Sequence, residues 1–134
     1  MTNNDIVPGF DKKRDKKLTI CLQEIKEVPH CLLLRLSGFV DKRNRALFEK
    51  RISKVIDAGF VRLIFDLGEF GFVSDDGLGC LTYCYKQVQL KGGDMVLFKI
   101  HPKAYEIFQL LGFSTFFIIR DNLEEAIDFF MLRQ

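Results

Sequence analysis

Four carboxylates close together in the middle of the chain are the first candidates for chemistry. Asp66 and Glu69 follow an apolar run, and Asp75 and Asp76 come a few residues later. Paired carboxylates can act as general acid and base, or they can bind Mg²⁺. No histidine or lysine stands among them as a catalytic partner. The group therefore does not predict an enzyme.

The cysteines offer a second kind of chemistry. Cys80 and Cys84 are one helical turn apart, so together with His30 or His101 they could bind zinc. Structural zinc sites usually contain tighter Cys-x-x-Cys pairs. All four cysteines stand in apolar runs, which favours packed, reduced thiols of a cytoplasmic protein. We therefore expect no metal site and no cofactor.

The composition is that of a single globular domain. The chain has 134 residues, of which 48% are hydrophobic and 28% are charged, and this length allows one sizeable core. Its 20 basic and 18 acidic residues lack the basic excess of a nucleic-acid-binding protein. No apolar run approaches the roughly 20 residues that cross a bilayer, and no secretory leader is evident. We expect a cytoplasmic protein that neither binds nucleic acid nor inserts into a membrane.

Apolar periodicity predicts the elements that position these side chains. Residues 1–15 are polar and are expected to form a flexible tail, followed by one domain over residues 16–134. Asp41 or Asn44 is expected to cap the first of four helices, which Gly59 ends. The other expected helices cover residues 77–90, 102–111 and 123–132, and the expected strands cover residues 18–25, 31–36, 60–66, 95–100 and 116–119.

The order of these elements predicts an α/β fold. The first two strands are joined by a short connection, which indicates a hairpin. The later strands are nearly continuous apolar runs separated by helices, which is typical of parallel strands covered on both faces. We expect a mixed sheet with an N-terminal hairpin, then parallel strands, and four helices.

Several short motifs follow one another in the order found in a known family. Asp66-Leu67 ends an apolar strand, and Gly77-Leu78-Gly79 begins the helix after it. This pattern resembles the signature of STAS domains, the fold of bacterial anti-sigma-factor antagonists, in which the strand leads to Asp-Ser-Ser-Gly-Leu-Gly. Further matches are Gly38-Phe39-Val40-Asp41, Gly92-Gly93, Ile107-Phe108-Gln109-Leu110-Leu111-Gly112-Phe113 and Leu123-Glu124-Glu125-Ala126. The resemblance covers nearly the whole chain beyond the tail and implies the same fold.

The chain departs from the family at the residue that carries the regulation. In the family, a partner kinase phosphorylates the last hydroxyl residue before the glycine, and here Asp76 holds that position. The resemblance implies that this serine phosphorylation cannot occur, because it needs a hydroxyl as nucleophile. Asp76 either caps the following helix or permanently imitates phosphoserine. Ser74, in place of the family's leading aspartate, is a weak alternative acceptor.

The resemblance implies a regulatory protein-binding domain and not an enzyme. In the family, the unphosphorylated antagonist binds an anti-sigma factor that is also a serine kinase, and phosphorylation breaks the complex. The implied partner-binding residues are Asp41, Ser74, Asp75, Asp76, Gly77 and Leu78, with Phe39 or Phe72 as aromatic anchors. Both phenylalanines could instead pack under the loops that carry them.

Two questions stay open at the level of the sequence. Asp76 could produce an antagonist that its kinase cannot switch off, or it could hold the protein in the released state. The alternative function is a non-catalytic scaffold subunit of a stress-signalling assembly or of a lipid-transport ABC system, since neither role needs the serine. The partner's identity is open, and so is the oligomeric state, with a homodimer as one option.

Overall fold

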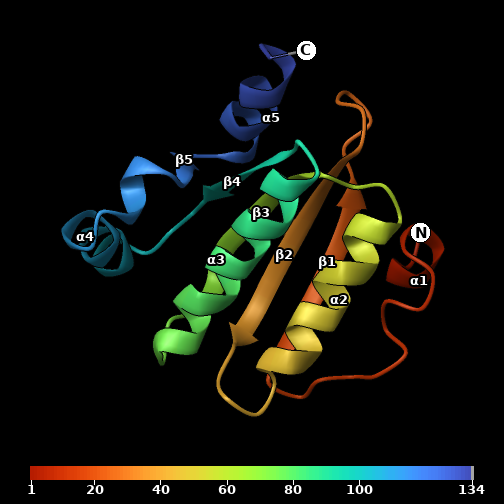
Figure 1. Ribbon diagram of the computed structural model, residues 1–134, viewed down its shortest axis with the longest axis horizontal. Helices are drawn as coiled ribbons and strands as arrows, with labels where there is room; N and C mark the ends of the chain where they lie inside the picture. The colour runs from red at the N-terminus through yellow and green to blue at the C-terminus, as the bar shows by residue number, and fades with distance from the viewer. Residues whose placement is uncertain (134) are drawn as a thin grey trace.

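The computed structural model describes residues 1–133 and contains one five-stranded sheet (Figure 1). The strands are β1 (Leu18–Glu24), β2 (Cys31–Phe39), β3 (Arg62–Gly71), β4 (Asp94–Phe98) and β5 (Ile118–Arg120), and they lie in this order across the sheet. β1 and β2 are antiparallel, and each later pair is parallel. The expected α/β fold, with an N-terminal hairpin followed by parallel strands, is confirmed.

Helices cover both faces of this sheet. They are α1 (Asn3–Ile6), α2 (Arg45–Asp57), α3 (Asp75–Leu90), α4 (Pro102–Leu110) and α5 (Leu123–Met131), with a short 3₁₀ turn at Phe113–Thr115. Figure 1 shows α2 and α3 side by side over one face, and α5 packs on the opposite face. The four expected helices are α2 to α5, and α1 is additional. No helix within residues 1–133 combines the length and the apolar character that crossing a bilayer requires.

Successive side chains along each strand point to opposite faces of the sheet, which divides the core into two layers. Leu34 and Phe65 face α2 and α3, whereas their chain neighbours Leu33 and Ile64 face α5. The central strands are buried on both faces, which explains why they are continuous apolar runs in the sequence. Because β2 and β3 run in the same direction, the starts of α2 and α3 meet at one end of the sheet.

The segment 1–15 differs from the expected flexible tail, because it is packed against the domain. It forms α1, and the side chains of Val7 and Phe10 are only 1% and 0% exposed. Arg51 of α2 donates a hydrogen bond to Asp11 at 2.9 Å. Burying a large apolar side chain contributes about 1.5–3 kcal/mol, so Val7 and Phe10 both help to hold this polar segment against the domain.

Candidate partner-binding site at the start of α3

The end of the sheet where α2 and α3 begin brings most of the predicted site residues together. Phe39 at the end of β2 pairs with Gly71 at the end of β3, so the loops that follow these strands are neighbours. The first loop carries Asp41, and the second leads to Ser74. Ser74 Oγ donates a hydrogen bond to the Val40 carbonyl oxygen at 3.5 Å, which links the two loops.

α3 begins at Asp75, two residues before the expected start, and Ser74 is its N-cap. The Ser74 backbone is extended (φ −157°, ψ 175°), and its Oγ accepts a hydrogen bond from the Asp76 backbone N–H at 3.3 Å. Asp76 is therefore not the helix cap. Asp75 and Asp76 both lie in the first turn, where negative charge interacts favourably with the helix dipole.

The Asp76 carboxylate is paired with a cation that the sequence did not single out. Arg45 Nη1 lies 3.1 Å from Asp76 Oδ1, and Arg45 Nε lies 3.1 Å from Glu49 Oε2. The hydrogen bond to Asp76, followed by that to Glu49, raises the pKa of Arg45 above its ordinary value. Arg45 is the first residue of α2, where a cation opposes the helix dipole. In the sequence, this unfavourable position at the start of a helix was the signal that Arg45 has a specific partner.

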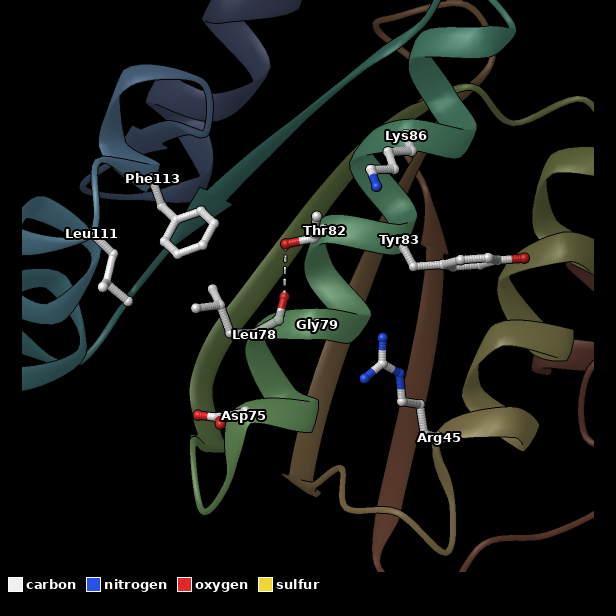
Figure 2. Close-up of a pocket in the computed structure, with 9 residues that line it drawn as sticks. All are labelled: Arg45, Asp75, Leu78, Gly79, Thr82, Tyr83, Lys86, Leu111 and Phe113. Atoms are coloured by element: carbon white, nitrogen blue, oxygen red, sulfur yellow. Dashed lines mark hydrogen bonds between the residues drawn. The ribbon is translucent and has the colours of Figure 1, made fainter.

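Gly79 provides the space that the Arg45 side chain occupies. A Cβ atom at Gly79 would lie 2.7 Å from Arg45 Nη1 and 2.9 Å from its Cζ. Figure 2 shows the guanidinium beside the first turns of α3, next to Gly79. The second glycine of the Gly-Leu-Gly motif therefore lets the Arg45 guanidinium lie against α3, where it pairs with Asp76.

Asp41 is fixed within the first loop by two cations and one backbone amide. Its Oδ2 lies 3.2 Å from both Lys17 Nζ and Arg43 Nη2, and its Oδ1 accepts the Arg43 N–H at 2.8 Å. Desolvation alone would raise the pKa of Asp41, but the hydrogen bonds from Arg43 and Lys17 outweigh it and lower the pKa to about 2. The strand before this loop needs Gly38, because φ is +118° and a Cβ there would collide with the Lys17 carbonyl.

The aromatic residues expected as anchors are half-buried. Phe72 packs edge-on against Phe70 and Phe108, with ring centroids 5.0 and 5.7 Å away. Phe39 is half-buried at the end of β2. Val73, which follows Phe72 in the loop, is 61% exposed. Val73 was not among the predicted site residues, because it continues the apolar run of Phe70 and Phe72 in the sequence.

A groove of about 590 Å³ runs along the outer side of α3 (Figure 2). It is lined by Arg45, Asp75, Leu78, Gly79, Thr82, Tyr83, Lys86, Leu111 and Phe113. Leu78 on one wall and Phe113 on the other point toward one another (Figure 2). The groove includes Asp75 and Leu78 of the expected partner-binding residues, whereas Asp41 and Phe39 lie outside its lining.

The carboxylates considered for acid–base or Mg²⁺ chemistry are divided between the two faces of the sheet. Asp66 lies on the α5 side, where its Oδ2 is 3.6 Å from Arg35 Nε and 4.0 Å from Lys99 Nζ. Asp76 pairs with Arg45 on the other side. Within residues 1–133, no three His, Cys, Asp or Glu side chains are grouped so as to hold a metal ion.

Cys80 and Cys84 are core residues of α3, and both are 0% exposed. Burial raises the pKa of the Cys80 thiol to about 12 and that of Cys84 well above its ordinary value. The Cys80 thiol donates a hydrogen bond to the Gly77 carbonyl oxygen at 3.0 Å. Both side chains therefore pack as apolar groups between α3 and the sheet.

Comparison with known proteins finds the same kind of domain. The family model for the STAS domain matches residues 23–126. BtrV of Bordetella bronchiseptica, a candidate anti-sigma factor antagonist, is 30% identical over 95 residues, which are 71% of this chain and 82% of BtrV. An anti-sigma F factor antagonist of Paenibacillus polymyxa is 25% identical over 97 residues, which are 72% of this chain and 83% of that protein.

A solved structure has the same architecture. The crystal structure of an anti-sigma factor antagonist from Mycobacterium paratuberculosis matches with a TM-score of 0.72 and covers 89% of this chain and 98% of its own. The sequences are 18% identical, so this likeness concerns the fold. The family match extends from β1 into α5 and includes the loops at the start of α2 and α3. This chain therefore belongs to the STAS domain family and has anti-sigma-factor antagonists among its relatives.

Proposed function

We propose that this protein is a non-catalytic, cytoplasmic anti-sigma-factor antagonist that binds an anti-sigma factor of the serine-kinase type. The binding surface comprises the two loops and the first turn of α3, with Asp41, Ser74, Asp75, Asp76, Gly77 and Leu78. Relatives that are named as antagonists support this class of partner. Binding is insensitive to the kinase activity, because Asp76 offers no hydroxyl at the position that the family phosphorylates.

The Arg45–Asp76 pair is the observation that carries this proposal. By resemblance to the family, phosphorylation releases the antagonist by adding negative charge to the interface. A phosphoserine adds about 1.5 to 2 negative charges, whereas Asp76 has one carboxylate, and Arg45 lies 3.1 Å from it. The Asp76 side chain is only 17% exposed. Arg45, which Asp76 shares with Glu49, therefore partly compensates this charge within the protein, and the surface carries less negative charge than that of a phosphorylated antagonist.

The surroundings of this pair suit a protein partner. Val73 is exposed beside the first turn of α3, and Leu78 and Leu111 add apolar area in the adjacent groove. Apolar side chains surrounded by polar ones are typical of the centre of a protein interface. Asp75 is exposed in the same turn and remains available to a cation of the partner.

Calorimetric titration with the serine-kinase anti-sigma factors of the source organism, with and without ATP, tests the proposal. We expect the wild-type protein to bind one of them with the same Kd in both conditions. Asp76→Ser restores a hydroxyl at this position, so this variant should bind without ATP, gain the mass of one phosphate with ATP, and then dissociate. Asp75→Ser is the matched control for phosphorylation, because it places a hydroxyl at the neighbouring exposed position; it should gain no phosphate with ATP, and its Kd should be the same with and without ATP.

Two results would contradict the proposal in different ways. If only Asp76→Ser binds, Asp76 acts as a permanent imitation of phosphoserine, and Arg45 does not compensate its charge. If neither protein binds any kinase-type anti-sigma factor, the class of partner is wrong. Co-purification with a large assembly or a transporter ATPase would then identify the protein as a scaffold subunit.

A further inference from the structure

The N-terminal segment is joined to the open edge of the sheet. We call residues 2–17 the N-terminal strap. β1 is an edge strand, and the Asn3 side chain pairs with its backbone. Asn3 Nδ2 donates to the Ile20 carbonyl oxygen at 2.6 Å, and Asn3 Oδ1 accepts the Leu22 N–H at 2.8 Å. One amide side chain thus satisfies two backbone groups that an edge strand leaves unpaired.

The middle of the N-terminal strap is anchored on α2. The Phe10 side chain is fully buried, and the Arg51 guanidinium lies 5.0 Å from the centre of its ring. Arg51 is itself 4% exposed and donates a hydrogen bond to Asp11 at 2.9 Å. Lys54 Nζ donates to the Gly9 carbonyl oxygen at 2.7 Å. Detaching this part would expose the Phe10 ring to water and break the Arg51–Asp11 pair, and exposing the ring is the larger cost.

The far end of the N-terminal strap is bonded to the partner-facing loop, residues 38–44. Asn44 is 4% exposed, and its Nδ2 donates to Asp15 Oδ2 and to the Phe39 carbonyl oxygen, each at 2.9 Å. Asn44 Oδ1 accepts the Asp41 N–H at 2.7 Å. Lys17 Nζ lies 3.2 Å from Asp41 Oδ2. Strap and loop therefore share one hydrogen-bond network with Asn44 at its centre.

The direction of the Asn44 side chain indicates what this network does. Asn44 is the N-cap residue of α2, yet its side chain makes no hydrogen bond to that helix. Asparagine at this position normally caps the helix, which contributes about 1 kcal/mol. Here the side chain bonds to the loop and the N-terminal strap instead. The local cap is replaced by contacts that fix Asp41.

We propose that the N-terminal strap holds the partner-facing loop in its binding conformation, with Asp15 and Asn44 as positioning residues for Asp41. The effect on binding rests on the proposed function, because that function names the partner. The effect on the conformation of the loop does not depend on it. Loss of the Asp15–Asn44 bond frees the loop while the anchors at Phe10 and Arg51 keep the domain folded. The N-terminal strap thereby makes partner affinity depend on a segment outside the partner surface.

Amide hydrogen exchange of the free protein tests the state of the loop. In Asp15→Ala, we expect the amides of Asp41 and Arg43 to exchange about tenfold faster, because one charge-assisted hydrogen bond is lost. Asp15→Asn retains an acceptor oxygen and should restore slow exchange. Arg14→Ala is the matched control, because Arg14 is the exposed neighbour of Asp15 in the N-terminal strap. Unchanged exchange in Asp15→Ala would overturn the inference.

Titration of the same variants with the kinase-type anti-sigma factor tests the consequence for binding. We expect Asp15→Ala to raise Kd about tenfold and Asp15→Asn to restore it, while urea unfolding of Asp15→Ala remains a single cooperative transition. The double variant Asp15→Ala/Asn44→Ala should bind no more weakly than Asn44→Ala alone, because the two substitutions remove the same hydrogen bond. Faster exchange with unchanged Kd would refute the link to binding. If the wild type binds no anti-sigma factor, the proposed function fails, while hydrogen exchange still decides the role of the N-terminal strap.

Discussion

Replacing Gly79 by alanine should separate Arg45 from Asp76 without destabilising the protein. A Cβ atom at this position would approach Arg45 Nη1 to 2.7 Å and Cζ to 2.9 Å, well inside van der Waals contact. The atoms that it meets belong to the end of a flexible side chain and not to the backbone. The guanidinium should therefore move away while α2 and α3 stay in place.

Two opposing contributions set the expected magnitude. Glycine inside a helix is about 1 kcal/mol less favourable than alanine, and Gly79 lies within the second turn of α3. The Arg45–Asp76 pair is partly exposed, with 39% of the arginine side chain accessible, and such pairs contribute roughly 0.2–1 kcal/mol. The free energy of unfolding of Gly79→Ala should thus be unchanged or higher by up to about 0.8 kcal/mol.

Urea unfolding of Gly79→Ala in two backgrounds measures both contributions. In Arg45→Ala, where no guanidinium is displaced, the same replacement should raise the free energy of unfolding by the full value of about 1 kcal/mol. The difference between the two backgrounds is the coupling energy of the displaced pair. A loss of 1 kcal/mol or more in the wild-type background would refute this reasoning, since it would mean that Arg45 cannot move and that the helices must separate.

Three further outcomes follow from pKa values and burial. Asp41 has a folded-state pKa of about 2 against an ordinary 3.8, so its stabilising effect is present above about pH 4 and is lost as pH falls toward 2. The difference in unfolding free energy between wild type and Asp41→Asn should therefore shrink over that range, and a constant difference would contradict the assignment. Cys21 is exposed and should react rapidly with a thiol reagent in the native protein. The remaining thiols should react only after unfolding, because they are buried; these are Cys31, Cys80 and Cys84. Phe10→Ala should cost about 3–5 kcal/mol in urea unfolding, whereas a flexible N-terminal segment would give no change.

The fold could be predicted because its signals are local and repeated. The core strands are apolar runs, and Leu33 and Leu34 face opposite layers, so the sequence pattern itself contains the two-sided burial. Glycines after α2 and α3 mark where these helices end. The order of strands and helices then leaves few topologies.

The details of the candidate site could not be predicted in the same way, because they depend on contacts between distant segments. Ser74 and Asp76 are both plausible caps, and only the extended backbone of Ser74 decides between them. Arg45 and Asp76 are 31 residues apart, and no local pattern relates them. The packing of residues 1–15 depends on Asn3 meeting β1 and on Phe10 meeting α2. Side-chain contacts of this kind have no periodicity that a sequence reveals.

The role of Arg45 in compensating the charge of Asp76 is tested most directly by the Kd for the kinase-type anti-sigma factor. Three proteins are compared: wild type, Arg45→Gln, and Arg45→Gln combined with Asp76→Asn. Removing the arginine exposes an uncompensated negative charge in the interface, so Arg45→Gln should bind about tenfold more weakly. The double variant, which has neither charge, should bind like the wild type. Equal binding by wild type and Arg45→Gln, or a double variant as weak as the single one, would contradict charge compensation at Asp76.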